Sequence, residues 1–568
     1  MKRLSLLGLV LTAALVLPTA TIGARVRTTR LSTVAFSPAT TAAKASASSV
    51  ITAAVREAAE RVTAARLKED LYYISSDAMA GRATPSPGLD ATAKFIADRL
   101  KAAKLKPAGD DGTYFQRIEL RSIKVDGSQT SAEMNGKTFK YGDDLLVAPT
   151  PGSASGQLVY AGHGWVIKSK NVDAYQGVDV RNKIVIISAA AAPPNVAPTE
   201  IGKVIQDAES PVSAAQKRGA NGVVMIPRYP DLAQWWAGRR RVLERDRFGV
   251  ARFQDRDAGD TPSALPTIMP SEAMLDQLFA GEQQGGAELR RNTVAGTTGP
   301  AFDLAATKSL SFKVSVANTT AITQNVVAVL EGKDRELKKE YVAIGAHYDH
   351  VGTGRPINGD AIYNGADDDG SGTVAVLSLA EAFARGPRPK RSILFVWHAA
   401  EERGLWGSEY FTDYPTVPLN QVVAQLNIDM IGRSRKEGDA NPKNRGLTGP
   451  DEIYVIGSKL MSTELGSLSE RVNQSYLNLK LNYFYDNPND SERLFYRSDH
   501  YNYARKGIPI IFYFDGIHED YHQPSDTADK IDYQKMEKVA RTVFVTAYEL
   551  SDAAKRPTVD KPLQMPER

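Results

Sequence analysis

The 568-residue sequence contains no cysteine. This absence excludes disulfide bonds, thiolate metal ligands, a cysteine nucleophile and the lipid-modified cysteine that tethers some exported proteins. Any metal ion must therefore be bound by histidine, aspartate or glutamate side chains. Histidine is scarce too, with seven residues in the whole chain, so few imidazoles are available as ligands.

The sequence also lacks a long run of like charges. Its 70 basic and 66 acidic residues give a net charge of +4 and are spread along the chain. Without a basic run to follow a phosphate backbone, we do not expect nucleic acid as a partner. Hydrophobic residues make up 42% of the chain and charged residues 24%, which is typical of a globular protein, and the length indicates two or more domains.

Long apolar runs are absent after the N-terminus. There, Met-Lys-Arg precedes LSLLGLVLTAALVL and a stretch of small residues that ends at Ala24. This pattern predicts a cleaved export signal over residues 1–24. A membrane anchor is the alternative, but the run is shorter than the roughly 20 residues that span a bilayer. We therefore expect a soluble periplasmic or extracellular protein without a lipid anchor or stable membrane insertion.

Differences in composition and in hydrophobic periodicity divide the remaining chain into segments. Residues 25–52 are rich in Ala, Ser and Thr and are expected to be a linker. Residues 53–123 and 308–555 alternate apolar strand-like runs with helical patterns, including helices expected over 90–105, capped by Asp90, and over 372–384. This predicts an α/β domain with a mixed, mainly parallel central sheet flanked by helices and functional groups at the strand carboxyl ends. Residues 556–568 are expected to be a tail.

An inserted β-rich domain is expected over residues 124–307. Short apolar runs there are separated by Gly, Asn, Asp and Pro. The segments VDVRNKIVIIS, SAAQKRGANGVVMIP and LPTIMPSEAMLDQLFAG resemble the protease-associated domain. Because the insert holds none of the matched ligands named below, we expect it to shape substrate access rather than chemistry.

Two polar segments lie near the first apolar, strand-like runs of residues 308–555. His347 and Asp349 follow the apolar run 341–346, and alternation places them on one face, where Asp349 could fix the tautomer of a ligand histidine. Alone, this pair favours a structural histidine. The aspartates 367–369 lie between glycines before a helix. That segment fits a cation site and a solvated acidic turn equally well.

Three further strands end in polar residues. Glu401 and Glu402 follow the buried strand SILFVWHAA, where two carboxylates are costly unless their charge is compensated. A metal bound by one carboxylate, with a proton exchanged by the other, would explain both. Asp429 follows the run 422–428, and Tyr521-His522 follow IPIIFYF. Taken singly, the first of these two segments favours an ordinary strand-end aspartate in a turn, and the second favours a surface histidine.

Five spaced motifs, GAHYDHVG, NGADDDGSG, HAAEERGLWGS, LNIDMIG and YHQPSDT, lie in this order between residues 345 and 527. Together they resemble the co-catalytic zinc aminopeptidase family, which includes bacterial leucyl aminopeptidase, glutamate carboxypeptidase, glutaminyl cyclase and the transferrin receptor. The resemblance implies the zinc exopeptidase fold, a protease-associated insertion and two zinc ions per chain. It assigns Asp368 as the bridging ligand, His347 and Asp429 to one zinc, Glu402 and His522 to the other, Glu401 as general base and Tyr521 as oxyanion donor.

The resemblance implies a metalloaminopeptidase that hydrolyses N-terminal residues from peptides with a free N-terminus, using a zinc-activated water. A carboxypeptidase or dipeptidase on the same centre is the alternative, and the cluster Arg239–Arg241 would suit a substrate carboxylate, although such runs are more often solvated. A non-catalytic binding protein is less consistent with a full ligand set and Glu401. The other histidines match no ligand position and are interpreted as structural or supporting, and Ser371 as a turn residue; they are His163, His350, His398, His500 and His518.

Overall fold

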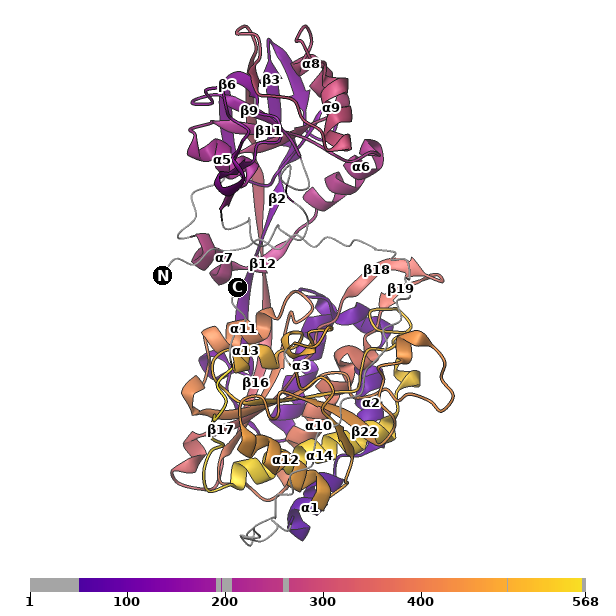
Figure 1. Ribbon diagram of the computed structural model, residues 1–568. Helices are drawn as coiled ribbons and strands as arrows, with labels where there is room; N and C mark the ends of the chain where they lie inside the picture. The colour runs from indigo at the N-terminus through magenta and orange to yellow at the C-terminus, as the bar shows by residue number, and fades with distance from the viewer. Residues whose placement is uncertain (1–50, 190–195, 197–206, 259–264, 488, 564–568) are drawn as a thin grey trace, which may run out of the picture.

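The computed structural model describes residues 51–189, 196, 207–258, 265–487 and 489–563, which form two lobes joined by a long two-stranded ribbon (Figure 1). The predicted export signal and most of the expected linker lie outside the described residues, as do residues 564–568 of the expected tail. Within the described ranges, no helix combines the length and apolar character that crossing a membrane requires.

The lower lobe is built on a mixed sheet that has ten strands among the described residues, in the order β12-β2-β16-β20-β17-β21-β24-β22-β23, with β1 beside β16. The central strands β20, β17, β21 and β24 run parallel to one another. The strands are β1 (Lys106–Pro107), β2 (Phe115–Val125), β12 (Phe248–Val250), β16 (Val316–Leu330), β17 (Tyr341–His347), β20 (Ser392–His398), β21 (Val422–Ile428), β22 (Glu452–Ile456), β23 (Lys480–Asn482) and β24 (Ile510–Phe514).

Helices cover both faces of this sheet because its strands are apolar on both sides. In β17, Val342 and Ile344 face the core under α10 and α14, whereas Ala343 faces the core beside α11 and α13. The helices are α1 (Ala53–Glu60), α2 (Ala64–Ile74), α3 (Pro87–Ala102), α10 (Gly372–Arg385), α11 (Trp406–Asp413), α12 (Thr463–Ser475), α13 (His500–Ala504) and α14 (Tyr533–Asp552).

The start of α3 differs from the sequence expectation. Asp90 was expected to cap this helix, but the cap is Ser86, whose hydroxyl accepts from the Leu89 N–H at 3.1 Å. Serine before a proline is a strong helix start, because proline at the first position has no N–H to satisfy. Asp90 instead lies in the first turn and accepts from the side chain of Gln324.

The upper lobe has its own sheet of nine strands among the described residues, in the order β4-β3-β15-β6-β9-β11-β13-β5 with β14 beside β6. A second, three-stranded sheet has the order β10-β7-β8. The strands are β3 (Ser131–Met134), β4 (Lys137–Lys140), β5 (Leu145–Val147), β6 (Gly152–Tyr160), β7 (Val166–Ile167), β8 (Val172–Asp173), β9 (Ile184–Ser188), β10 (Ala208–Glu209), β11 (Gly222–Ile226), β13 (Thr267–Pro270), β14 (Phe302–Asp303) and β15 (Ser309–Val314), and the helices are α5 (Pro211–Lys217), α6 (Leu232–Leu243), α8 (Glu272–Leu278) and α9 (Gly286–Ala295).

The ribbon between the lobes consists of β2 and β16, which pair antiparallel from Phe115 opposite Val326 to Val125 opposite Val316. The Asp126 N–H donates to the Ser315 carbonyl at 2.9 Å where the two strands enter the upper lobe. Strand β15 lies within the upper sheet, past residue 307, where the sequence analysis placed the end of the insert. Every second residue of β15 belongs to the core of the upper lobe. The chain returns to the ribbon only after the end of β15.

One segment of the upper lobe returns to the lower lobe. Strand β12 pairs with β2, and helix α7 (Ala251–Ala258) follows it directly. Arg256 of α7 reaches Glu409 and Asp413 of α11 at 3.2 and 3.1 Å, and Phe253 lies 6.1 Å from Tyr410, centroid to centroid. The upper lobe is thus attached at two places, the ribbon and α7 (Figure 1).

We expect Trp397→Ala to lower the free energy of unfolding of the lower lobe by about 3–5 kcal/mol, because Trp397 is fully buried in β20 and the change leaves a large cavity. It also removes the bond from the indole N–H to the Thr373 carbonyl. Denaturant unfolding followed by circular dichroism measures the change. The exposed aromatic Phe484 is the control, and Phe484→Ala should stay within about 0.5 kcal/mol of wild type. Equal effects would contradict the assigned core.

Candidate metal centre

The predicted site residues meet because neighbouring parallel strands end at the same edge of the sheet. Strands β20, β17, β21 and β24 are adjacent and parallel. His347 is the last residue of β17, and Asp429 follows β21 directly. Glu401 and Glu402 follow β20 after two alanines, and His522 lies in the loop after β24. The topology therefore places the side chains where ligands bind in open α/β sheets.

A first group of possible metal ligands consists of His347, Asp368 and Asp429. His347 Nε2 lies 3.3 Å from Asp368 Oδ1 and 3.7 Å from Asp429 Oδ1. The second oxygen of Asp429 accepts from the Ser498 hydroxyl at 2.6 Å, which leaves Oδ1 directed to the group. These are the three residues that the resemblance assigns to one zinc ion.

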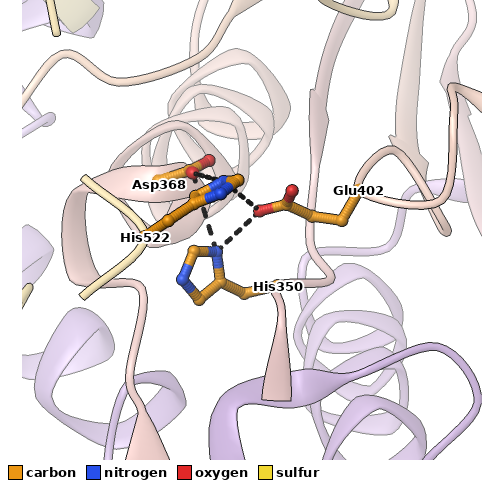
Figure 2. Close-up of side chains that lie close together, drawn as sticks. All are labelled: His350, Asp368, Glu402 and His522. Carbon is orange, nitrogen blue, oxygen red and sulfur yellow. Dashed lines mark ion pairs between the residues drawn. The ribbon is translucent and has the colours of Figure 1, made fainter. Parts of the chain in front are cut away.

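A second group contains His350, Asp368, Glu402 and His522 (Figure 2). His522 Nε2 lies 3.0 Å from Asp368 Oδ2 and 3.1 Å from Glu402 Oε1. Asp368 thus offers Oδ1 to the first group and Oδ2 to the second. Three members are residues assigned to the other zinc ion, whereas His350 was interpreted as structural or supporting. The structure instead places its Nδ1 2.8 Å from Glu402 Oε1.

The second group fits a metal ion because its donor atoms have no other partner. Asp368 Oδ2, Glu402 Oε1, His522 Nε2 and both ring nitrogens of His350 are buried and, within the described part of the chain, make no hydrogen bond. Buried polar atoms without partners are costly. Burial alone would lower the pKa of His522, but Asp368 and Glu402 raise it to about 10. The carboxylates thus favour a positive charge at this position, which a metal ion can supply in place of the proton.

The aspartates 367–369 are not a solvated turn, because all three are buried. They lie in the irregular turn Ala366–Ser371, where the Asp368–Asp369 peptide bond is cis. Asp369 accepts from the N–H groups of His347, Gly372 and Met430 and so joins β17, α10 and the loop after β21. Burial, followed by the nearby Asp429 carboxylate, raises the pKa of Asp369 well above its usual range.

Asp368 is held by a second buried carboxylate. Asp526 accepts from the backbone N–H groups of Asp367 and Asp368 at 3.0–3.2 Å. Burial raises the pKa of Asp526 to about 6, and the neighbouring Asp367 carboxylate also raises it. His518, interpreted as supporting, places Nε2 3.3 Å from Asp367 Oδ2. The motif YHQPSDT therefore contributes an anchor for the acidic turn as well as a ligand.

Glu401 lies beside the first group without belonging to either group. Its Oε2 is 4.0 Å from His347 Nε2. Burial raises the pKa of Glu401 well above its usual value, and the carboxylates of Glu402, Asp429 and Asp499 add to this effect against the opposing influence of His347. A carboxyl group in such surroundings is suited to proton exchange near neutral pH.

Asp349 supports both His347 and Glu401. His347 Nδ1 lies 3.1 Å from the main-chain carbonyl of Asp349 and 3.6 Å from its Oδ1. The nearer contact is thus the carbonyl, whereas the sequence analysis expected the carboxylate. The carboxylate itself accepts from the Glu401 N–H at 3.0 Å and from the Thr84 hydroxyl at 3.2 Å. One residue therefore orients His347, predicted to be a ligand, and the backbone of Glu401, predicted to be the general base.

Tyr521 stacks on His522, with ring centroids 4.0 Å apart and planes at 19°. Arg497 Nη2 lies 3.5 Å from the phenol oxygen. Burial, followed by the charges of Asp368 and Glu402, raises the pKa of Tyr521. The phenol therefore keeps its proton and remains a hydrogen-bond donor beside the second group, as the oxyanion role requires.

Strained backbone lies next to the ligand-bearing strand ends. Ala400, Met430 and His522 have φ values of 59°, 56° and 54°. A non-glycine residue in this left-handed region costs on the order of 1–2 kcal/mol. Ala400 precedes Glu401, Met430 follows Asp429, and His522 itself belongs to the second group of possible metal ligands. The sharp changes of direction thus occur where side chains must turn toward a common centre.

Arg82 is a supporting residue that the sequence analysis did not find. It is fully buried, and its guanidinium donates at 2.8–3.0 Å to the carbonyls of Ile74, Tyr348, Asn364 and Gly365. It therefore joins α2, the residue after His347 and the loop before Asp368. No sequence motif indicates this role. An arginine among loop residues is usually exposed, so its burial could not be expected from the sequence.

The remaining histidines have separate roles. His398, at the end of β20, lies between Asp499 Oδ2 at 3.2 Å and the Tyr503 hydroxyl at 3.0 Å, all fully buried. His500 stacks on Phe512 with centroids 4.5 Å apart. These contacts agree with structural roles. His163 lies in the upper lobe, where Nδ1 accepts from the Trp165 N–H.

Two donor groups share one carboxylate, and a further carboxyl group lies alongside, which is an arrangement suited to holding two metal ions. Residues 325–547, which are less than half of the chain, match the sequence model of Peptidase family M28. This match confirms the predicted resemblance to the co-catalytic zinc aminopeptidases. The sheet order confirms the predicted mixed α/β fold class.

The chain is also similar to individual proteins. A protein of Arthroderma benhamiae named "Probable leucine aminopeptidase" is 28% identical over 250 residues, covering 42% of this chain and 61% of its own length. "Leucine aminopeptidase 1" of Coccidioides posadasii is 30% identical over 243 residues, covering 40% of this chain and 56% of its own length. The chain thus spans less than two thirds of these relatives. A solved structure, "Aminopeptidase from Aneurinibacillus sp. strain AM-1", covers 91% of this chain and 99% of its own, with 17% identity and a TM-score of 0.46.

We expect Arg82→Met to lower the free energy of unfolding by about 3–5 kcal/mol and to weaken metal binding by roughly 10- to 100-fold. The substitution leaves four carbonyls and the buried carboxylates nearby without the guanidinium. Denaturant unfolding and chelator competition measure the two effects. Arg181, which is exposed and pairs with Asp179, is the control, and Arg181→Met should change neither property appreciably. Wild-type metal affinity in Arg82→Met would contradict this role.

Proposed function

We propose that this protein is a zinc-dependent aminopeptidase that removes N-terminal residues from peptides. The arrangement that supports this most strongly is the sharing of Asp368 between two donor groups, with Glu401 beside the first group. Histidine and carboxylate donors suit zinc. The relatives named leucine aminopeptidase support the same reaction. Bound zinc ions would polarise the scissile carbonyl and lower the pKa of a water molecule at the centre.

The chain's own residues supply proton transfer and orientation. Glu401, whose raised pKa suits proton exchange, would accept a proton from the attacking water and donate it to the departing amine. Tyr521 would donate a hydrogen bond from its phenol to the oxyanion that develops on the oxygen of the scissile carbonyl, a contact worth roughly 3–4 kcal/mol. Asp349 would hold both His347 and Glu401 in the required positions.

The preference for a free N-terminus follows from the excess of carboxylates. Glu401, Asp429 and their neighbours favour an ammonium group close by, and a bound ammonium would place the first peptide bond at the centre. The carboxypeptidase alternative has one specific observation in its favour, because the exposed Arg497 lies beside Tyr521 and is suited to bind a carboxylate. Arg240 of α6, in contrast, pairs with Glu244 within the upper lobe.

Two further proposals concern location and access. The export signal expected at residues 1–24 supports action in the periplasm or outside the cell. The resemblance of the insert to the protease-associated domain supports a role in limiting which peptides reach the centre. Both are independent of the chemistry at Glu401.

We expect Glu401→Gln to lose about 10²- to 10⁴-fold in kcat while retaining two zinc ions and the fold, because this residue exchanges a proton without binding metal. Glu402→Gln should instead lose zinc, because Glu402 Oε1 is one of the donor atoms of the second group. Peptide hydrolysis and metal analysis on both variants measure the difference. The opposite pattern would mean that ligand and base are exchanged.

We expect acetylation of a peptide's N-terminus to abolish cleavage and amidation of its C-terminus to have little effect, because acetylation removes the ammonium charge that the carboxylates favour. Mass spectrometry of products from free, acetylated and amidated versions of one peptide follows the reaction. Sequential release of single residues from the N-terminus is the expected pattern. Cleavage that is blocked by amidation alone would identify a carboxypeptidase.

A further inference from the structure

We propose that His350 is a direct metal ligand through Nδ1, so that the second metal ion has four protein donors: His350, Asp368, Glu402 and His522. This inference rests on the proposed two-metal function and concerns how the two ions differ. The resemblance of the sequence motifs assigns His350 no ligand role, and the inference comes from the position of its ring.

The distances around the second group fit one tetrahedral ion. Four pairs of donor atoms involve one of the two histidines and one of the two carboxylates, and their separations are 2.8, 3.0, 3.1 and 3.7 Å. All donor atoms lie within 4.8 Å of one another. Ligands bound to zinc at 2.0–2.1 Å in a tetrahedron lie about 3.3 Å apart. The observed separations scatter around that value.

The direction of the ring nitrogen favours a metal ion over a hydrogen bond. Although His350 Nδ1 lies 2.8 Å from Glu402 Oε1, the two atoms lack hydrogen-bond geometry, and both are buried without a partner in the described residues. His522 Nε2 has the same character at 3.0 and 3.1 Å from its carboxylates. The two rings approach the carboxylates from different directions, with ring planes at 74° (Figure 2). The nitrogens therefore face a shared central point.

The backbone fixes His350 in this position. Its N–H donates to the Arg82 carbonyl at 3.1 Å, and its ring is fully buried. The ring packs on Gly365, where a Cβ atom would lie 2.5 Å from the ring carbons Cγ and Cδ2. Gly365 has φ 58° and leads into the turn that carries Asp368. Glycine at this position therefore allows the imidazole to lie against the loop of the bridging carboxylate.

The two metal positions would then be unequal. The first group has three donors, His347, Asp368 and Asp429, and the second has four. A site closed by four protein ligands is typical of tightly held metal, whereas a site with three keeps an open position. The open position would lie in the first group, beside Glu401. We infer that the second ion binds more tightly and that the first exchanges more readily.

X-ray absorption at the zinc edge of the wild-type protein tests the ligand count without any substitution. Three histidines, His347, His350 and His522, should contribute to the spectrum of a sample that holds two zinc ions per chain. In His350→Ala, the imidazole contribution should fall by about a third. Chelator competition should show one of the two zinc affinities weakened beyond about 100-fold, the upper limit for loss of a merely supporting contact.

The matched control is His500→Gln, because His500 is equally buried in the same lobe but contacts Phe512 and the Phe495 carbonyl. It should retain both zinc affinities and the full imidazole contribution. His350→Gln serves where His350→Ala does not fold, with thermal unfolding in the presence and absence of zinc as a check of folding. Two histidines in the wild-type spectrum, or unchanged zinc affinities in a folded His350 variant, would overturn the proposal. A wild-type protein that binds no zinc would instead overturn the proposed function.

Discussion

The centre depends on Asp368, whose two oxygens face two different donor groups. One carboxylate can serve both only if its position is fixed from several directions, because movement toward one group withdraws it from the other. Asp526 holds the backbone N–H of Asp368, Asp369 ties the same turn to β17 and α10, and Arg82 binds the loop before it. Much of the buried polar structure near the sheet edge therefore serves a single side chain.

This arrangement also explains the unusual number of buried carboxylates. A buried carboxylate is unfavourable unless a positive charge or several hydrogen-bond donors lie near it. Asp369 and Asp526 accept hydrogen bonds from backbone N–H groups, whereas Asp368 and Glu402 face imidazoles and each other. The hydrogen bonds of the first pair come from the fold itself and tie neighbouring segments together. The second pair keeps Asp368 Oδ2 and Glu402 Oε1 without a hydrogen-bond partner in the described residues, so these oxygens are available to a cation, which distinguishes the scaffold carboxylates from the candidate ligands.

Much of the lower lobe was predictable, because strand ends followed by polar residues are visible as patterns in the sequence. His347, Asp429 and the glutamates after β20 all lie at the ends of clear apolar runs, and the order of motifs identified the family. Arg82 and His350 were not predictable in the same way. Arg82 lies more than 200 residues before three of its four partners and acts through main-chain carbonyls, which no side-chain pattern reveals. His350 was interpreted as structural or supporting because a fourth donor beside Asp368, Glu402 and His522 depends on the direction of its ring and not on spacing along the sequence. The cap of α3 was misassigned because Asp90 and Ser86 are both suitable, and only the local backbone selects between them.

The attachment of the upper lobe has a mechanical consequence. A body carried on a single two-stranded ribbon is free to twist about the ribbon's long axis. Here β12 adds a third strand along β2, and α7 pins the same segment to α11. Because α7 is anchored to α11 beside the ribbon, twisting the upper lobe about the ribbon would separate Arg256 from Glu409 and Asp413. We therefore expect such twisting to cost more free energy than it would for a lobe attached by the two-stranded ribbon alone.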